Sequence, residues 1–219
     1  MEPEFWHEIW AQEKIGFHQH DFNKHMQSFI GRLGLRPGEN IFVPLCGKSL
    51  DLIWLMRRGY RVTGVEISPR AVRDFFSEHR LEPRISELPD GQLFEAAGLQ
   101  IFCMDFFGLE ADRLPRIDAV YDRAALVALP ADMRKTYAAR LTSLTPPSAP
   151  ILLVTLEYPE TEMSGPPFPV TPHEVQDLFG TSFDIEQVYS EDCLAREPRF
   201  REKGLSRMVE RVHILRKRG

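Results

Sequence analysis

The stretch IFVPLCGKS, residues 41–49, decides the fold of this chain. Its apolar beginning leads into a turn of small residues, and an amphipathic segment follows over residues 50–56. Gly59 ends that segment, and a second apolar run over residues 62–65 leads directly to Glu66. The order of apolar run, turn, helical period, glycine and apolar run is typical of a βαβ unit with parallel strands.

Glu66 lies at the tip of the second predicted strand, about 20 residues past the turn, where a carboxylate can accept from both hydroxyls of a ribose. The unit is therefore predicted to hold a cofactor that carries a nucleoside. The Gly47-Lys48-Ser49 sequence suggests a P-loop, but that motif needs a glycine at the place of Phe42. A dinucleotide site needs three glycines around the pyrophosphate, and Gly47 is the single glycine of this turn. S-Adenosylmethionine, which has no diphosphate, and a plain βα turn without a ligand both stay open.

The composition limits the classes of protein to which this chain can belong. With 219 residues, of which 43% are hydrophobic and 27% charged, the chain is expected to form one globular domain. A net charge of −5 argues against a general nucleic-acid binder. The three cysteines are too far apart for a zinc pattern or a disulfide framework, which suits a reducing compartment. With no apolar run near the ~18 residues of a membrane span and no signal peptide, we expect a cytoplasmic protein without a membrane partner. His18, His20 and His25 lack a carboxylate at fixed helical spacing, so no metal site is expected. A monomer without nucleic-acid partners is expected as well.

The flanking segments give a coarse order of elements. Residues 5–16 place aromatic side chains at helical spacing, which predicts either a helix packed on the core or a lid over a ligand. Asp21 or Asn23 is expected to cap a second helix that ends at Leu33. Residues 80–98 are polar and contain Pro and Gly, which is typical of an insertion. Further strands are predicted at residues 99–104, 117–121, 151–156, 183–189 and 208–215. Helices are predicted at 69–79, with Ser68 as the cap and Pro69 as the first position, at 130–144, and at 172–179, with a cap at Thr171.

Two charged residues, Asp105 and Arg123, come just after predicted strands. They are therefore expected at the edge where open parallel sheets bind ligands. Asp105 and Phe106 come after the third strand, where an acid can meet an adenine amino group and a ring can stack on the base. A helix cap is an equally good interpretation of Asp105. Arg123 follows the fourth strand and is predicted to face the crevice, or else to pair with Asp122 or a surface carboxylate.

The later part of the chain offers a candidate wall for a substrate. Residues 158–172 contain Pro159, Pro166, Pro167, Pro169 and Pro172, so this segment is predicted to be a stiff loop, largely without regular structure. Phe168 would give that loop an apolar face, although a plain connection is the alternative. Arg199 lies in the basic stretch 193–204, which is either a solvated hairpin or a loop that faces an anion.

Four stretches carry a resemblance to a known family: FVPLCGKS at 42–49, GVEIS at 64–68, YDRAALVA at 121–128 and GPPF at 165–168. Together with FWHEIW at 5–10 and GFH at 16–18, they resemble the thiopurine S-methyltransferase family, bacterial branch. The resemblance runs over essentially the whole chain in order. The PLCGK turn, which replaces the glycine-rich loop usual in methyltransferases, is its most specific part.

The resemblance implies an α/β, class I S-adenosylmethionine-dependent methyltransferase fold of the Rossmann-like type. Such a fold has a seven-stranded, mostly parallel sheet with an antiparallel last strand and helices on both faces. The chain would be a single domain, 1–219, with an N-terminal helical lid at 1–38 and a core at 39–219. The implied reaction methylates the sulfur of thiopurines and other aromatic thiols with S-adenosyl-L-methionine, giving S-adenosyl-L-homocysteine, and selenium or tellurium compounds are further acceptors.

By the same resemblance, the cofactor contacts would be Trp10, Leu45, Glu66 and Arg123, with Asp105 and Phe106 near the adenine. Arg123 and Arg199 would face the substrate as the catalytic residues, and Phe17 and Phe168 would be the aromatic walls of the substrate pocket. A small-molecule thiol or metalloid is therefore the expected partner. A nicotinamide-dependent oxidoreductase and a non-catalytic nucleotide-binding module stay open as alternatives, because both would also use Glu66.

Overall fold

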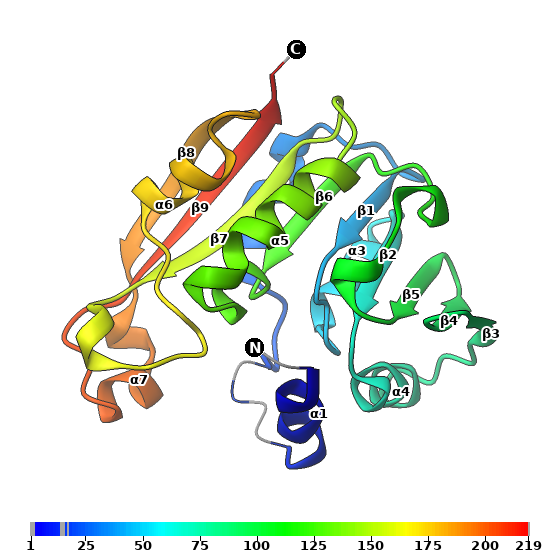
Figure 1. Cartoon of the computed structure of the whole chain (residues 1–219), viewed down its shortest axis with the longest axis horizontal. Helices are drawn as coiled ribbons and strands as arrows, with labels where there is room; N and C mark the ends of the chain where they lie inside the picture. The colour runs from blue at the N-terminus through cyan, green and yellow to red at the C-terminus, as the bar shows by residue number, and fades with distance from the viewer. Residues whose placement is uncertain (1–2, 14–15, 17, 219) are drawn as a thin grey trace. The chain divides into compact units, whose positions relative to one another are not determined.

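The computed structural model describes residues 3–13, 16 and 18–218, and the chain divides into two compact units, Met1–Tyr121 and Asp122–Gly219. The first unit opens with helix α1 (Pro3–Ala11), helix α2 (Lys24–Phe29) and the 3₁₀ turn η1 (Ile30–Leu33) (Figure 1). Of the two predicted caps, Asn23 is the one that caps α2, because its side chain accepts from the backbone N–H groups of His25 and Met26.

The predicted βαβ unit is confirmed. Strand β1 (Asn40–Val43) is followed by helix α3 (Leu50–Arg57) and strand β2 (Arg61–Glu66), and the two strands pair in parallel. The Ser49 side chain caps α3 by accepting from the N–H of Asp51, which satisfies one of the donors that a helix start leaves unpaired. This unit sets the direction of the sheet, so the turn after β1 and the end of β2 lie at the same edge.

The rest of the first unit continues that sheet. Helix α4 (Pro69–Glu78) packs against β2 and β5 (Leu99–Cys103), and its first turn has the predicted Ser68 cap and Pro69 start. Strand β5 pairs in parallel with β2, and the first residues of β6 (Ala119–Arg123) pair in parallel with β1. The parallel strands thus follow the order β5-β2-β1-β6. The 3₁₀ turns η2 (Phe106–Gly108) and η3 (Ala111–Arg113) lie between β5 and β6.

The expected number of seven strands is too low, because the described residues contain nine. The two additional strands, β3 (Arg84–Leu88) and β4 (Gly91–Ala96), form an antiparallel hairpin where an insertion was predicted, and β4 also pairs with β5. The alternation of apolar and polar residues that marks a strand is weak in these two, because β3 has no buried residue and β4 buries only Phe94. Ala97 and Gly98, with φ of +51° and +84°, close the tight turn into β5.

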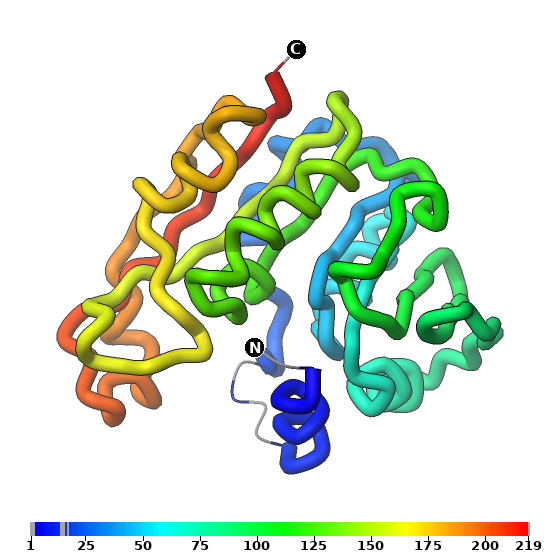
Figure 2. Tube along the Cα trace, in the orientation of Figure 1, coloured from blue at the N-terminus to red at the C-terminus, as the bar shows by residue number. Residues whose placement is uncertain are grey.

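The second unit contains the strands β7 (Ile151–Glu157), β8 (Phe183–Asp192) and β9 (Val209–Lys217), and β9 lies between the other two. Strand β9 is antiparallel to both β7 and β8, which confirms the predicted antiparallel last strand. The helices and 3₁₀ turns of this unit are η4 (Leu126–Ala128), α5 (Ala131–Leu144), η5 (Glu160–Glu162), α6 (Pro172–Phe179), η6 (Leu194–Arg196) and α7 (Pro198–Glu202). Between β7 and α6 the chain runs as an open loop, drawn in yellow in the Cα trace (Figure 2).

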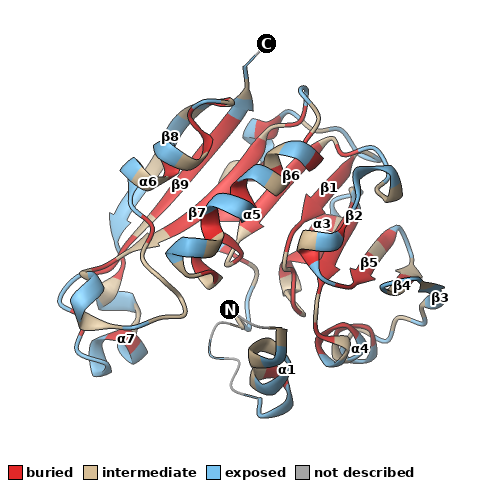
Figure 3. Ribbon diagram, in the orientation of Figure 1, coloured by how far each residue is buried: buried red, intermediate tan, exposed pale blue. Residues whose placement is uncertain are grey.

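The buried core is concentrated in the strands. All four residues of β1 and the first five of β7 are buried, whereas α5 and α6 each show one buried and one exposed face (Figure 3). This pattern is expected for amphipathic helices that cover a sheet. Among the described residues, the helices are too short or too polar to cross a bilayer.

Candidate functional site

The turn after β1 has an unusual backbone. Leu45 and Gly47 have φ of +45° and +53°, and a leucine in this left-handed region is uncommon. The turn is held against β2 by the hydrogen bond from the Cys46 N–H to the Val65 carbonyl (3.0 Å). Backbone strain of this kind persists only where the surroundings enforce it, and it is concentrated at functional sites.

Trp10, near the end of α1, lies directly over this turn. A Cβ atom on Gly47 would be 3.0 Å from Cζ2 of the Trp10 indole, so a larger residue would push the ring away. The indole is only 4% exposed. The N-terminal helix therefore covers the turn with an aromatic ring, and Gly47 is required both for its φ and for this close approach.

Glu66 ends β2 and holds the turn from the other side. The Gly47 N–H donates to its Oε2 (2.9 Å) and the Ser68 N–H donates to its Oε1 (2.8 Å). Burial raises the pKa of this carboxyl to about 7. Hydrogen bonds from the backbone N–H groups of Ser68, Gly47 and Ile67 lower the pKa, but their effect is smaller than that of burial. Each carboxylate oxygen has two lone pairs, so both oxygens can still accept from a diol. The structure thus brings Trp10, the Leu45–Gly47 turn and Glu66 together within the first unit.

Asp105 and Phe106 follow β5 at the same edge of the parallel strands. Asp105 is exposed, and its side chain caps η2 by accepting from the Phe107 N–H (3.0 Å). The Phe106 ring is buried and meets the Phe107 ring edge-on, with 5.6 Å between the centroids. The cap is therefore present in the structure, while a contact of either residue with an adenine stays a prediction.

Asp122, at the end of β6, is fully buried. It accepts from the Tyr137 hydroxyl (2.6 Å) and from the Leu126 N–H (3.2 Å). Burial raises its pKa to about 6, although the Tyr137 hydroxyl and the backbone donors lower it. Because these donors already hold the carboxylate, the structure gives no support to the interpretation that Arg123 serves only to pair with Asp122. The backbone then turns at Ala124, with φ of +63°, and the Arg123 side chain is half-buried.

Phe168 lies in the proline-rich loop, and a hydrogen bond connects this loop to the segment that follows Arg123. The Phe168 N–H donates to the Val127 carbonyl (2.7 Å). The Phe168 ring packs against the backbone of Gly165, where a Cβ atom would collide with it. Within the second unit, the structure therefore joins the segments that carry two of the predicted site residues, Arg123 and Phe168.

Arg199 lies in α7 and makes local contacts. Its guanidinium lies 4.6 Å from the centroid of the Phe200 ring and 3.6 Å from the Glu197 carboxylate, and its side chain is 47% exposed. Phe200 itself is buried in a small cluster with Tyr158, Cys193, Leu205 and Met208. A contact of Arg199 with substrate stays a prediction. Phe17, the other predicted wall, lies outside the described residues.

Sequence reasoning missed three buried polar residues that support these segments. Asp51 accepts from the Asn23 N–H (2.8 Å) and from the Tyr121 hydroxyl (2.9 Å). Arg134 and Tyr137, one turn apart on α5, hold the proline-rich loop and Asp122, respectively. A single polar residue on the apolar face of an amphipathic helix is the one signal that could have found them.

A cleft of about 410 Å³ adjoins Trp10 between α1 and α4. Its charged side chains are paired with one another: Lys48 with Glu78 (2.6 Å), and Arg70 with both Glu13 (2.8 Å) and Asp74 (3.5 Å). These pairs link the end of α1 and the turn to α4. Exposed ion pairs contribute little to stability, so packing of Trp10 on Gly47 is the stronger tie between α1 and the turn.

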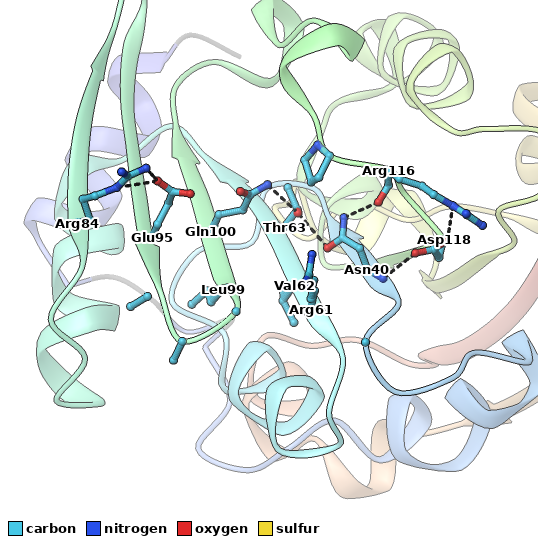
Figure 4. A pocket seen from close by; sticks show the side chains of 15 residues that line it. Asn40, Arg61, Val62, Thr63, Arg84, Glu95, Leu99, Gln100, Arg116 and Asp118 are labelled. Carbon is cyan, nitrogen blue, oxygen red and sulfur yellow. Dashed lines mark hydrogen bonds and ion pairs between the residues drawn. The ribbon is translucent and has the colours of Figure 1, made fainter.

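A larger cavity, of about 640 Å³, lies at the opposite edge, where the parallel strands begin (Figure 4). Its floor is a chain of hydrogen bonds from Gln100 to Thr63 (3.1 Å), from Thr63 to Asn40 (3.0 Å), and from Asn40 to the Arg116 carbonyl (3.0 Å). Ligands of open parallel sheets bind at the carboxyl ends of the strands, so this cavity is not the expected site. The chain of hydrogen bonds satisfies polar groups that the strand starts would otherwise leave buried and unpaired.

Over the described residues, no three His, Cys, Asp or Glu side chains are grouped closely enough to hold a metal ion. The three cysteines, all within the described residues, are buried and form no disulfide, and burial raises the pKa of the Cys46 thiol well above its usual value. Within the first unit, the groups next to the turn are the buried Glu66 carboxylate and the Trp10 indole. A single-glycine turn without a diphosphate cradle, facing a carboxylate with free lone pairs, fits S-adenosylmethionine and does not fit a dinucleotide.

Comparisons with known proteins agree with this chemistry. The sequence profile of the family "Thiopurine S-methyltransferase (TPMT)" matches residues 1–218. A thiopurine S-methyltransferase of Nitrosospira multiformis is 46% identical over 98% of both chains, and one of Azotobacter vinelandii is 44% identical over the full length of both.

Solved structures of more distant proteins share the fold. A 1,6-didemethyltoxoflavin-N1-methyltransferase of Burkholderia thailandensis aligns with a TM-score of 0.65 at 17% identity, over 99% of this chain and 87% of that one. An S-adenosylmethionine-dependent methyltransferase of Anabaena variabilis aligns with a TM-score of 0.67 at 13% identity, over 99% and 95%. The fold is thus the class I methyltransferase fold predicted above. The chain belongs to the thiopurine S-methyltransferase family and is an S-adenosylmethionine-dependent methyltransferase.

Proposed function

We propose that the protein transfers a methyl group to the sulfur of an aromatic or heterocyclic thiol, with thiopurines as the substrate class. The observation that carries the proposal is the hydrogen bond from Phe168 to Val127, which joins an aromatic loop to the segment of Arg123. A ring and a cation on adjoining segments suit a flat acceptor with an anionic sulfur. The names of the relatives at 44–46% identity support the same substrate class.

On the cofactor side, Glu66 would accept from the ribose hydroxyls, and the Leu45 turn would receive the amino-acid part. Trp10 would cover the bound molecule, and Asp105 and Phe106 would lie near the adenine. When bound, S-adenosylmethionine supplies an electrophilic methyl group, and S-adenosylhomocysteine is the product. The contribution of the protein is to hold that group in place and to exclude water from it.

On the acceptor side, no strong base is needed, because a heteroaromatic thiol is already largely a thiolate near neutral pH. Arg123 would favour the anionic form of the acceptor and orient it, and Phe168 would stack on its ring. Holding the sulfur and the methyl carbon in line can lower the activation free energy by on the order of 7–11 kcal/mol. Arg199 is proposed as a second cation on this side.

The same arrangement accepts other soft nucleophiles, so we also propose selenium and tellurium compounds as acceptors. We further propose that the chain acts as a single domain, 1–219, with a helical lid at 1–38, and as a cytoplasmic monomer without nucleic-acid partners.

The test is a radiolabelled methyl-transfer assay with 6-mercaptopurine, selenite and tellurite in parallel. We expect methylated product from 6-mercaptopurine, and product from selenite or tellurite would extend the acceptor range. Thermal-shift titration separates the alternatives, because S-adenosylhomocysteine should stabilise the protein and NAD should not. Stabilisation by S-adenosylhomocysteine without product from any acceptor would instead indicate a non-catalytic binding module.

A further inference from the structure

The proline-rich loop has few backbone donors with which to hold its shape. Three of the four residues from Pro166 to Pro169 are prolines, so Phe168 provides the single backbone N–H of this stretch. That N–H is used on the Val127 carbonyl. The loop must therefore be fixed mainly through its carbonyl oxygens, by donors from other segments.

Two side chains supply those donors. The Tyr158 hydroxyl donates to the Pro167 carbonyl (2.6 Å), and Nη1 of Arg134 donates to the Pro169 carbonyl (3.0 Å). At the end of the loop, the Val170 N–H donates to the Leu156 carbonyl (2.7 Å). Phe168 is thus fixed from the residues on both sides of it.

Arg134 does more than hold one carbonyl. Its Nε donates to the Leu129 carbonyl (2.9 Å), at the end of the segment that follows Arg123. Its Nη1 also lies 2.7 Å from each oxygen of Glu174 on α6. The guanidinium carbon lies 6.0 Å from the centroid of the Phe168 ring, within the range of a cation–π contact. One side chain therefore connects the Arg123 segment, the proline-rich loop, α6 and the Phe168 ring.

The burial of this arginine needs an explanation. The side chain of Arg134 is 4% exposed, and that of its partner Glu174 is 27% exposed. Removing an ion pair from water is costly, and apolar residues of similar size often give equal or greater stability. What apolar residues cannot do is hold two backbone carbonyls and a carboxylate in one fixed geometry, which is the particular property of a guanidinium.

We infer that Arg134 is a positioning residue that fixes the proline-rich loop on the Arg123 segment and thereby sets the place of the Phe168 ring against a flat acceptor. Arg134 acts through Phe168 and need not touch the substrate. The inference deepens the proposed function and rests on it for the nature of the acceptor. It makes Arg134 a determinant of acceptor affinity, not of cofactor binding.

The central variant is Arg134→Lys, which keeps the charge and the pairing with Glu174 but cannot reach both carbonyls with one rigid fork. We expect the KM for 6-mercaptopurine to rise about three- to tenfold, which corresponds to the loss of one stacking contact. The kcat and the affinity for S-adenosylhomocysteine should change less than twofold. Lys135→Gln, at an exposed position on the same helix, is the matched control and should leave all three values unchanged.

A double-mutant cycle with Phe168→Ala separates positioning from general stability. If Arg134 acts through the ring, Arg134→Lys should have no further effect on KM once Phe168 is alanine. An equal increase of KM in both backgrounds, or a fall in kcat and Tm with KM unchanged, would overturn the inference and leave a merely structural arginine.

Hydrogen exchange gives a readout that does not depend on activity. In Arg134→Lys, the Phe168 and Val170 amides should exchange at least about tenfold faster, because the loop opens more often. Unchanged protection of these amides contradicts the positioning role, even in a protein that methylates thiopurines well. Absence of any product from 6-mercaptopurine in the wild type would contradict the proposed function instead, and the exchange result would still decide the role of Arg134 in the loop.

Discussion

The proposed cofactor side lies in the first unit and the proposed acceptor side in the second, and each is stabilised internally by a different kind of contact. On the cofactor side, Glu66 accepts from the N–H groups of Gly47 and Ser68, so a single βαβ unit provides every partner. On the acceptor side, Arg134 joins Leu129, Pro169 and Glu174, and the last of these lies 40 residues further along the chain. The first arrangement uses backbone groups, and the second depends on particular side chains from distant segments.

The two sides are therefore expected to respond differently to amino-acid substitutions. Backbone N–H groups are present in every sequence that adopts the turn, so the cofactor side depends on very few residue identities. The acceptor side can be altered by a single substitution at a supporting residue, because one side chain anchors several segments. We therefore expect losses of cofactor binding to come from Glu66 and the turn, and changes of acceptor preference to come from the second unit.

The largest expected effect is that of Glu66→Ala. The variant leaves the Gly47 and Ser68 N–H groups without their acceptor and would remove the two hydrogen bonds that we propose Glu66 accepts from the ribose. Charge-assisted hydrogen bonds are worth about 1.5–3 kcal/mol each, so S-adenosylhomocysteine should bind at least about 100-fold more weakly. Isothermal titration calorimetry measures this. Glu78→Gln, which changes a half-exposed glutamate paired with Lys48, is the control and should bind almost normally.

Arg123→Ala comes next and tests the acceptor side. Loss of the cation should lower kcat/KM for 6-mercaptopurine about 30- to 100-fold, since a charge-assisted contact to a thiolate is worth about 2–3 kcal/mol. Steady-state kinetics measures the change, with circular dichroism to show that the fold is kept. Arg196→Ala, an exposed arginine of the same unit paired with Glu191, serves as the control. Normal turnover in Arg123→Ala would remove this residue from the site.

The same contrast explains what the sequence could and could not predict. The βαβ unit, the Ser68 and Thr171 caps and the acid at the end of β2 all follow from short-range patterns, and the structure confirms them. The turn at Gly47 was found as a small-residue break, although the left-handed backbone of Leu45 has no sequence signal. Local rules suffice where the contacts themselves are local.

Long-range features were missed for a physical reason. The β3–β4 hairpin lies at the edge of the sheet, and Ile85 is 49% exposed, so the alternation that marks a half-buried strand is faint. Arg134 and Tyr137 look like ordinary helix residues until their partners from other segments are known. No spacing rule connects Arg134 to Pro169, because that contact depends on how two elements pack.

A pH titration should show an effect of about tenfold on the cofactor side. Burial raises the pKa of Glu66 to about 7, from 4.5 in an exposed group, so the carboxylate is mostly protonated at pH 6. The protonated acid accepts less well from a diol, and affinity for S-adenosylhomocysteine should fall about tenfold between pH 8 and pH 6. The folded state binds this proton more tightly than the unfolded state does. The contribution of Glu66 to stability therefore increases as pH falls from about 7 towards 4.5, opposite to its effect on binding.

Calorimetry at pH 6, 7 and 8 measures the affinity, and thermal melts over the same range measure the stability. Glu66→Gln should bind weakly with no pH dependence of its own, because it does not titrate. A wild-type affinity that is constant from pH 8 to pH 6 would mean that the Glu66 carboxylate is not the group that receives the ribose.

The smallest expected effect belongs to Arg199→Ala, which separates the two arginines named as catalytic candidates. Arg199 is 47% exposed and packs over its neighbour Phe200, and exposed cation–π contacts and ion pairs contribute about 0.2–1 kcal/mol. We expect kcat/KM for 6-mercaptopurine to fall by at most about threefold, with a slight loss of stability from the Phe200 cluster. A fall as large as that of Arg123→Ala would show that α7 contributes a substrate contact. The acceptor side would then include a charge carried by an exposed helix of five residues, and its specificity would depend on how firmly the Phe200 cluster holds that helix.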